Sequence, residues 1–375
     1  MKREWVLGWE ARLLLLATAV LVVFGLAAVY SASSALIEHG RPVGSGRVLV
    51  QVVGATIGAL LLLVASRVNL ERVRGLAWIF VVVTMVLLLV LVMPGTGAIA
   101  PRINGSRRWL DLGVSIQVSE IAKLAIVIWT AALCAKKGAD VKHLRRGLLP
   151  VLVVAVPVAA LIMLEPDLST AVTIVFLAMM VLFAAGARIG HFIFLGLVAT
   201  PLLWTEIQAV QYRLLRVSTF LDPGTQGRLG QGYQIDQSLI GVGSGGLFGV
   251  GFGQGHQKLG FLPYPYSDFI FATIAEEWGF IGVTAIAALY LLYVLIALRL
   301  AKASGDPFRQ LLGIGLATMV GTDAFLHMAV TVGIVPTTGL VLPFISYGRS
   351  GLVVALIATG LLINLGTRRR QALAA

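Results

Sequence analysis

Ten apolar stretches alternate with shorter polar segments along the chain. Each is about as long as, or longer than, the roughly 20 residues that an α-helix needs to cross a bilayer. They cover residues 13–34, 48–65, 76–93, 117–135, 148–164, 169–186, 191–208, 269–298, 310–333 and 350–366. The pattern predicts an all-α polytopic membrane protein with about ten transmembrane helices.

One long polar segment interrupts this pattern, at about residues 209–267, between the seventh and eighth predicted helices. The other connections are mostly short, and the sequence shows no obvious tandem repeat or low-complexity linker. We therefore expect a single membrane domain over residues 1–375, with one large extracytoplasmic loop.

The composition agrees with a membrane protein. Hydrophobic residues make up 58% of the chain and charged residues 12%, whereas soluble domains carry about 25% charged residues. The net charge of +12 does not indicate nucleic-acid binding, because the basic residues form short clusters between apolar runs. Lipid headgroups and an anionic lipid substrate suit these clusters better. The single cysteine, Cys134, excludes an intrachain disulfide and a cysteine-based metal cluster.

The distribution of Lys and Arg predicts the orientation. An even number of helices places both ends on one side, and most of the 29 Lys and Arg residues then fall on that side. By the positive-inside rule, both termini are cytoplasmic and residues 209–267 lie outside. The first apolar run is long enough to span and lacks a convincing cleavage site, so we expect a transmembrane helix rather than a cleaved signal.

The outer segment after the third predicted helix combines charge with a turn. Asn104-Gly105 is followed closely by Arg107, Arg108 and Trp109. Two arginines can bind a phosphate bidentately, and Trp suits the headgroup region. The alternative is an interfacial belt that holds ordinary lipid.

Three polar residues mark the start of the fourth predicted helix. Gln117, Glu120 and Lys123 are spaced to share one helix face. Charges at membrane depth are costly and face a cavity or each other. Either Glu120 and Lys123 form an intrahelical ion pair, or the face lines a cavity in which Lys123 meets an anionic group.

Further ionisable residues lie near later helices. Asp167 could cap the helix that follows it, and together with Glu165 it could hold a divalent cation, Mg²⁺ or Mn²⁺. Asp323 and His327 stand four residues apart and could hydrogen-bond within one helix. The five histidines show no spacing that predicts a zinc site.

The segment between the last two predicted helices, residues 335–350, is rich in Pro and Gly yet remains apolar. Such backbone is tolerated at membrane depth only beside protein or a cavity, so we expect a re-entrant segment. Ser346, Tyr347 and Arg349 provide hydrogen-bond donors there, and Ser346 and Tyr347 are candidate substrate contacts.

Asp268 is the carboxylate at the junction between the long polar segment and the eighth predicted helix. It could act as a base, or it could cap that helix. Glu276 follows eight residues later, near the same helix face, which makes it a candidate for the same cavity.

Six motifs together resemble, in order and spacing, the SEDS family of cell-shape and division proteins. They are NGSRRW, QVSEIAKL, EPDLSTA, GQGYQIDQSLIGVGSGGLFG, QKLGFLPYPYSDFIFATIAEEWGFIG and PTTGLVLPFISYG. The resemblance covers nearly the whole chain. The runs before Leu262-Pro263 and before Leu342-Pro343 are more similar to the division branch than to the elongation branch.

The resemblance implies a peptidoglycan glycosyltransferase that polymerises lipid II on the outer face of the cytoplasmic membrane, without an organic cofactor. Asp268 matches the family's proposed catalytic aspartate. The resemblance also implies partners, namely a class B penicillin-binding protein (an FtsI-like transpeptidase) and other division proteins. The chain departs from the family pattern at Tyr264, Tyr266, Ser267 and Arg349.

The chemistry of this reaction assigns roles to the candidates. Lipid II carries an α-linked sugar on pyrophosphate and the glycan is β-linked, so one inverting displacement needs a base and stabilisation of the departing pyrophosphate. Asp268 fits the base, and Arg107, Arg108 and Lys123 suit the pyrophosphate, where a divalent cation could assist. A lipid II flippase and a non-catalytic scaffold that activates a transpeptidase are the alternatives.

Overall fold

The computed structural model describes residues 8–34, 37–38, 41–42, 44–102, 105–111, 113–221 and 231–367. Asn104 of the predicted phosphate-binding turn and residues 222–230 of the predicted outer loop lie outside the described residues.

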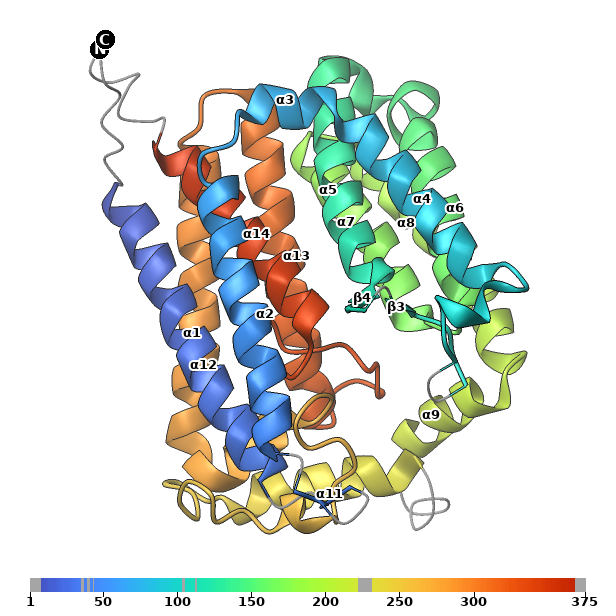
Figure 1. Ribbon diagram of the computed structural model, residues 1–375. Helices are drawn as coiled ribbons and strands as arrows, with labels where there is room; N and C mark the ends of the chain where they lie inside the picture. Colours follow the sequence, from blue (N-terminus) through green and yellow to red (C-terminus); the bar gives the residue numbers. More distant parts are fainter. Residues whose placement is uncertain are drawn as a thin grey trace.

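In the part of the chain that the structure describes, ten apolar helices form the body of the protein (Figure 1). They are α1 (Trp9–Ser33), α2 (Gly44–Ala65), α4 (Ala77–Val92), α5 (Val118–Lys137), α6 (Leu149–Leu164), α7 (Leu168–Ala184), α8 (Ile189–Gln208), α12 (Ile270–Lys302), α13 (Pro307–Thr331) and α14 (Arg349–Thr367). Eight of them belong to segments long and apolar enough to span a membrane, and α4 and α7 are shorter apolar helices. The predicted all-α polytopic fold is confirmed, because each helix coincides with one predicted stretch.

The connections contain short elements. They are α3 (Leu70–Gly75), α9 (Gln211–Leu221), α11 (Gln231–Ser244), the 3-10 turns η1 (Thr96–Ala98), η2 (Gly138–Lys142) and η4 (Gln257–Leu259), and the π-helical turn η3 (Leu144–Leu148). Among the described residues, two antiparallel ribbons pair β1 (Ile37–Glu38) with β2 (Arg41–Pro42) and β3 (Trp109–Asp111) with β4 (Ser115–Gln117). The long polar segment is therefore not a plain loop, since it includes α9 and α11.

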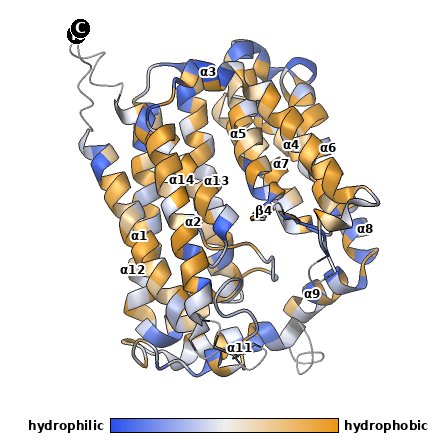
Figure 2. Cartoon of the chain, in the orientation of Figure 1, coloured by the Kyte–Doolittle hydropathy of each residue, from blue (hydrophilic) through white to orange (hydrophobic). Residues whose placement is uncertain are grey.

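The two ends of the helix bundle differ in composition. The start of α1, the end of α14, and α3, η2 and η3 lie at one end, whereas α9 and α11 lie at the other (Figure 1). Hydrophilic residues gather at both ends and around β4, and apolar residues cover the helices between them (Figure 2). The basic residues of α3, η2 and η3 agree with a cytoplasmic position for the first end, which stays a prediction.

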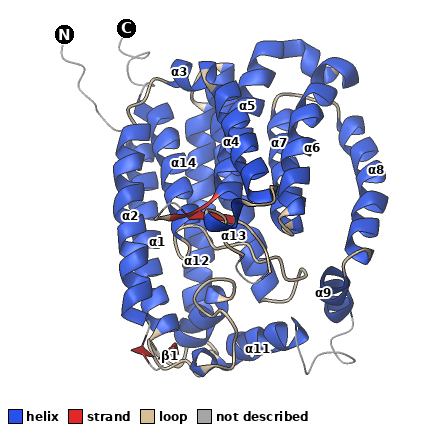
Figure 3. Cartoon of the chain, turned by 45° about the vertical axis from the view of Figure 1, so that its right-hand side comes forward, coloured by secondary structure: helices blue, strands red, loops and turns tan. Residues whose placement is uncertain are grey.

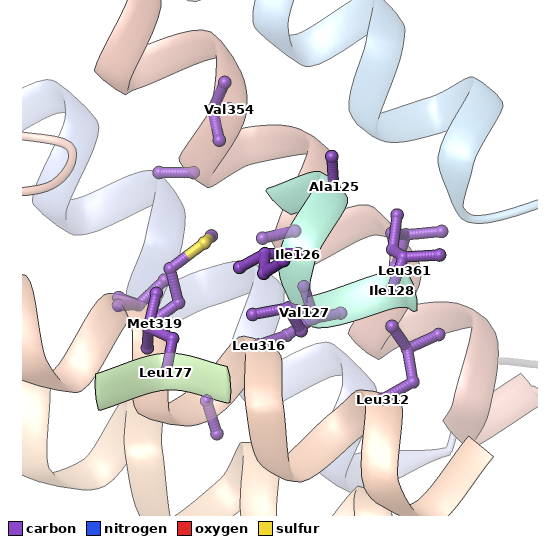
Figure 4. Packing of buried hydrophobic residues seen from close by; sticks show 14 of the residues in the cluster. Ala125, Ile126, Val127, Ile128, Leu177, Leu312, Leu316, Met319, Val354 and Leu361 are labelled. Carbon is purple, nitrogen blue, oxygen red and sulfur yellow. The ribbon is translucent and has the colours of Figure 1, made fainter. Parts of the chain in front are cut away.

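Helix α5 lies at the centre of the core. Ile126 and Val127 of α5 pack beside Leu177 of α7 and Leu316 of α13 (Figure 4). A Cβ atom on Gly315 would stand 2.6 Å from Cγ1 of Val127, so this glycine permits the close approach of α13 to α5. Close packing at small residues is the main source of helix association inside a bilayer.

Helix α8 stands apart from the bundle (Figure 3). Every residue of α8 is described, and none is buried. Near its beginning, the ring of Phe192 lies 5.5 Å from that of Phe183 on α7, and its other end continues into α9.

Helix α12 is broken at Gly279, which has φ 65° and ψ −165°. Residues 246–251 occupy the break and pair with its backbone. Val250 and Gly251 donate to the carbonyls of Glu276 and Glu277 at 2.9 and 3.1 Å, and Phe280 and Ile281 donate to those of Gly246 and Leu247 at 2.8 and 3.2 Å. The break therefore leaves these backbone groups satisfied, as a membrane environment requires.

The break gives a testable prediction for Gly279→Ala. A Cβ atom at Gly279 would stand 2.3 Å from the backbone nitrogen of Gly249, whereas nothing lies within 4 Å of one at Gly253, which also has positive φ. Positive φ strains a side chain at both positions. The ψ of −165° at Gly279 adds a backbone region that is open almost only to glycine, and only this substitution displaces residues 246–251. We expect Gly279→Ala to lower the unfolding temperature of the detergent-solubilised protein more than Gly253→Ala does. Equal shifts would contradict this packing.

Candidate active site

Asp268 is partly buried in the last turn of the chain before α12. The N-cap residue of α12 is Phe269, and no side chain hydrogen-bonds to this cap within the described chain. The alternative that Asp268 caps the helix is therefore not what the structure shows. The carboxylate instead has Ser267 as a hydrogen-bond partner.

Two arginines from distant segments lie near Asp268. Burial raises the pKa of Asp268, while the Ser267 hydrogen bond and the positive charges of Arg216 and Arg108 lower it. The net shift is upward. A carboxylate with a raised pKa is a stronger base, and its two cationic neighbours form an anion-attracting environment.

Arg108 is fixed at the turn between α6 and α7. Its Nη2 donates to the carbonyl of Pro166 at 2.6 Å and its Nε to that of Glu165 at 3.4 Å. Its Nη1 lies 3.5 Å from Oδ2 of Asp167. The short β3–β4 ribbon places this arginine beside the turn, so the predicted phosphate-binding loop meets the Glu165-Pro166-Asp167 motif.

Arg216 comes from α9, in the long polar segment. Its Nη1 donates to the carbonyl of Thr337 at 3.3 Å, and burial lowers the pKa of its guanidinium. Tyr212, one turn earlier, donates to the carbonyl of Pro166 at 3.1 Å. Helix α9 thus contacts both the α6–α7 turn and the α13–α14 connection.

Glu165 and Asp167 have different environments. Oδ1 of Asp167 accepts from the backbone nitrogen of Thr170 at 3.1 Å, so its predicted capping role is confirmed. Glu165 is 1% exposed, and neither of its carboxyl oxygens has a hydrogen-bond partner among the described residues. Burial, with the nearby Asp167, raises the pKa of Glu165 to about 9, so it is protonated at neutral pH.

These two carboxylates do not make a metal site by themselves. Among the described residues, no group of three or more His, Cys, Asp or Glu side chains could hold a metal ion. One oxygen of Asp167 is engaged by α7, and Glu165 is neutral. The residues present do not fit a divalent cation, and the predicted Mg²⁺ or Mn²⁺ requirement stays a prediction.

The α13–α14 connection supports the Asp268 loop. Oγ of Ser346 donates to the carbonyl of Ser267 at 2.8 Å, and the backbone nitrogen of Tyr347 donates to the carbonyl of Tyr266 at 2.9 Å. The guanidinium of Arg47 lies 3.8 Å from the centre of the Tyr266 ring. Ser346 and Tyr347 thereby hold the chain on either side of Ser267, next to Asp268.

The residues that depart from the family pattern take part in this support. Tyr266 lies between Arg47 and the ring of Tyr347, whose centre is 5.7 Å away. Arg349 donates to the carbonyl of Ser115 in β4 at 3.1 Å. Arg349 therefore ties α14 to the ribbon that carries Arg108.

The predicted face of α5 is engaged elsewhere. Nζ of Lys123 lies 2.9 Å from Oε1 of Glu120 and 2.6 Å from Oδ2 of Asp323 on α13, and Lys123 is 1% exposed. The intrahelical ion pair exists and a third residue joins it. The predicted bond between Asp323 and His327 is wrong, because His327 contacts the carbonyl of Leu340 through Nδ1 and its Nε2 has no partner among the described residues.

The remaining candidates mainly contact groups of the protein backbone. Arg107 donates to the carbonyl of Met93 at 3.2 Å, and Trp109 pairs with Gln117 in the β3–β4 ribbon. Glu276 accepts from the backbone nitrogens of His256 and Gln257, at 2.8 and 3.2 Å. The substrate roles predicted for these residues and for Lys123 stay predictions.

A buried ion pair that the sequence did not single out anchors the loop before Asp268. Nζ of Lys258 lies 2.7 Å from Oε1 of Glu277 on α12 and 2.9 Å from Oγ of Ser31 on α1. Ser31 also donates to Glu277 at 2.6 Å. All three are almost fully buried. We call this group the Lys258 latch.

A groove on the protein lies away from Asp268, Arg108 and Arg216. It is an apolar groove of about 690 Å³ between α7, α12 and α13, and the described residues that line it include no charged side chain. We call Asp268, Arg108 and Arg216 the Asp268 cluster. The charged residues that the predicted chemistry needs lie in this cluster and not in the groove.

The Lys258 latch predicts a non-additive stability effect. Removing one partner of a buried ion pair costs about 3–5 kcal/mol because the other charge stays buried. Lys258→Met or Glu277→Gln alone should lower the unfolding temperature strongly. The double variant should lower the unfolding temperature by much less than the sum of the two single decreases. Additive decreases would show that the two residues do not act together.

Glu165 predicts how stability depends on pH. Its pKa is raised from 4.5 to about 9 in the folded protein, so the folded state binds more protons than the unfolded state between these values. This carboxyl therefore makes stability fall as pH rises from about 5 to about 9. In unfolding scans over this range, Glu165→Gln should gain stability relative to the unsubstituted protein as pH rises. The stability of the exposed Asp111→Asn control should change with pH as that of the unsubstituted protein does. If the stability of Glu165→Gln also changed in this way, Glu165 would not be a buried neutral carboxyl.

Comparison with known proteins shows similarity over nearly the whole chain. Residues 11–371 match the model of the cell cycle protein family FTSW_RODA_SPOVE. The chain is 38% identical over 360 residues to the probable peptidoglycan glycosyltransferase FtsW of Geobacter sulfurreducens, covering 96% of this chain and 95% of that one. It is 36% identical to the stage V sporulation protein E of Bacillus subtilis, with 96% and 97% covered.

Two solved structures share the arrangement of helices. One comes from work titled "Structural coordination of polymerization and crosslinking by a peptidoglycan synthase complex", with 30% identity, a TM-score of 0.78, and 98% of this chain and 100% of that chain covered. The other is the rod shape determining protein RodA of Thermus thermophilus, with 28% identity, a TM-score of 0.70, and 97% and 98% covered.

Proposed function

Because the chain belongs to the cell cycle protein family FTSW_RODA_SPOVE, we propose that its Asp268 cluster joins lipid II units into glycan strands. The protein is a peptidoglycan glycosyltransferase, as its curated relatives are named. The main support for this site is that Arg108 and Arg216 lie near Asp268, a partly buried carboxylate with a raised pKa.

Asp268 acts as the base in this proposal. It accepts the proton of the acceptor's 4-hydroxyl as that oxygen attacks the anomeric carbon of the donor from the face opposite the pyrophosphate. The attack inverts the configuration at that carbon. The raised pKa of Asp268 increases its basicity, and the positive charges of the two arginines favour its ionised form.

Arg108 and Arg216 stabilise the departing pyrophosphate. Negative charge develops there in the transition state, and guanidinium groups in a partly buried site interact strongly with phosphate oxygens. Arg108 is held by two backbone carbonyls and Arg216 by a third. These fixed positions reduce the reorganisation needed when the charge develops. Arg216 thus takes the place that the sequence suggested for Lys123.

The membrane setting follows the same proposal. The protein is a multi-pass membrane protein, and the basic residues at the α3 end favour cytoplasmic termini. The Asp268 cluster then lies on the extracytoplasmic side, where septal glycan is made. A class B penicillin-binding protein is the proposed partner, supported by the solved synthase complex that this chain resembles.

Gel analysis of lipid II polymerisation by the purified protein tests these roles. Asp268→Ala and Asp268→Asn should reduce glycan synthesis by about 10²–10⁴, because the base is lost. Arg216→Ala and Arg108→Ala should each reduce it by about 10²–10³. The exposed Arg102→Ala should leave synthesis unchanged, and unfolding scans should confirm that every variant is folded.

Each alternative has its own outcome in the same series. Normal polymerisation by both Asp268 variants would show that Asp268 is not the base. Lipid II transfer across sealed vesicles that contain only this protein would instead indicate a flippase. A transpeptidase that is activated equally by the unsubstituted and Asp268→Ala proteins, without polymerisation by either, would indicate a scaffold. An EDTA arm with Mg²⁺ or Mn²⁺ re-addition tests the divalent cation.

A further inference from the structure

The segment that fills the break in α12 presents apolar side chains outward. Leu247, Phe248 and Phe252 are 63%, 79% and 47% exposed. Trp278, Phe280 and Ile281 at the break are also exposed, and the ring of Phe252 lies 6.2 Å from that of Trp278. These six residues, which we call the 247–281 patch, form an apolar surface whose exposure to water would be unfavourable in free energy.

The backbone of this segment is suited to an apolar environment. Residues 246–251 exchange hydrogen bonds with both sides of the α12 break. The sequence has no ionisable side chain between Asp236 and His256. A segment with satisfied backbone groups and no charge can lie at the level of lipid chains without being helical.

Two helices give the same depth for the patch. On α12, Gly279 precedes the basic residue Arg299 by 20 positions, which is about 30 Å of helix and equals the hydrocarbon thickness of a typical bilayer. On α1, Ser31 follows Arg12 by 19 positions, or about 28 Å. Ser31 touches Glu277, so both counts place the boundary of the hydrocarbon core at the α12 break.

The patch also continues the lipid-facing surface. Leu291 and Leu295 are exposed further along α12, and Val20 and Val23 are exposed on α1. Trp side chains, such as that of Trp278, favour the boundary between lipid chains and headgroups. Continuity and depth both favour lipid over a protein as the occupant.

We propose that residues 246–252 form a membrane anchor, which inserts Leu247, Phe248 and Phe252 into the leaflet at the α11 end of the protein. The anchor is connected to the Lys258 latch through α12. It therefore also sets the position, relative to the membrane surface, of the loop that ends in Asp268. The insertion itself does not depend on the proposed enzymatic activity.

Spin-label accessibility in the full chain tests this insertion. Cys134 is the only cysteine, so Phe248→Cys and, separately, Phe252→Cys would be labelled in a Cys134→Ala background. The proteins would be placed in nanodiscs of phosphatidylethanolamine and phosphatidylglycerol. His256→Cys, at an exposed polar site on the same loop, and Val23→Cys, on the lipid-facing side of α1, are the matched controls.

The expected result is a shift at both test sites toward oxygen collisions and away from a water-soluble nickel chelate. Their ratios should lie between those of His256→Cys and Val23→Cys. Ratios equal to that of His256→Cys would show that the segment is in water and overturn the anchor. Protection from both reagents would show that protein covers the patch, which also overturns it. Unfolding scans confirm that each labelled protein is folded.

Discussion

A broken helix inside or beside a bilayer must have its backbone groups paired, because an unpaired amide in an apolar medium costs several kcal/mol. Helix α12 is broken at Gly279, and residues 246–251 supply the missing partners. The Lys258 latch fastens the following loop to α12 and α1. The position of Asp268 depends on this arrangement, since the loop that is fastened in this way ends in that carboxylate.

Two groups of charged residues differ in their partners. Lys123 and Lys258 are neutralised by carboxylates from other helices and hold helices together. Around Asp268, by contrast, Arg108 and Arg216 both donate to backbone carbonyls, and Arg108 also lies 3.5 Å from Oδ2 of Asp167. A buried cation with carbonyl partners retains its attraction for an anion. This difference separates the site from the structural ion pairs more clearly than burial does.

Much of the fold could be predicted from the sequence, because the length of an apolar stretch is a local property. The ten helices, the capping role of Asp167 and the Glu120–Lys123 pair follow from short-range spacing. The partner of Lys123 did not follow, because Asp323 lies 200 positions away in the sequence. Arg216 and Tyr212 were not selected for the same reason. Their one local signal was the basic, amphipathic character of residues 211–221 within the long polar segment.

The isolation of α8 links the proposed site to the bilayer itself. Helix α8 has no buried residue, so the match between its apolar length and the local hydrocarbon thickness contributes to its inclination. Helix α8 touches the bundle near its beginning through Phe192 and continues at its far end into α9, which carries Arg216. Because Tyr212 and Arg216 hold α9 to Pro166 and Thr337, a thicker or thinner membrane would act on α8 between two points of attachment, Phe192 and α9. Lipid chain length thereby becomes a mechanical load on the helix that continues into the Arg216 segment.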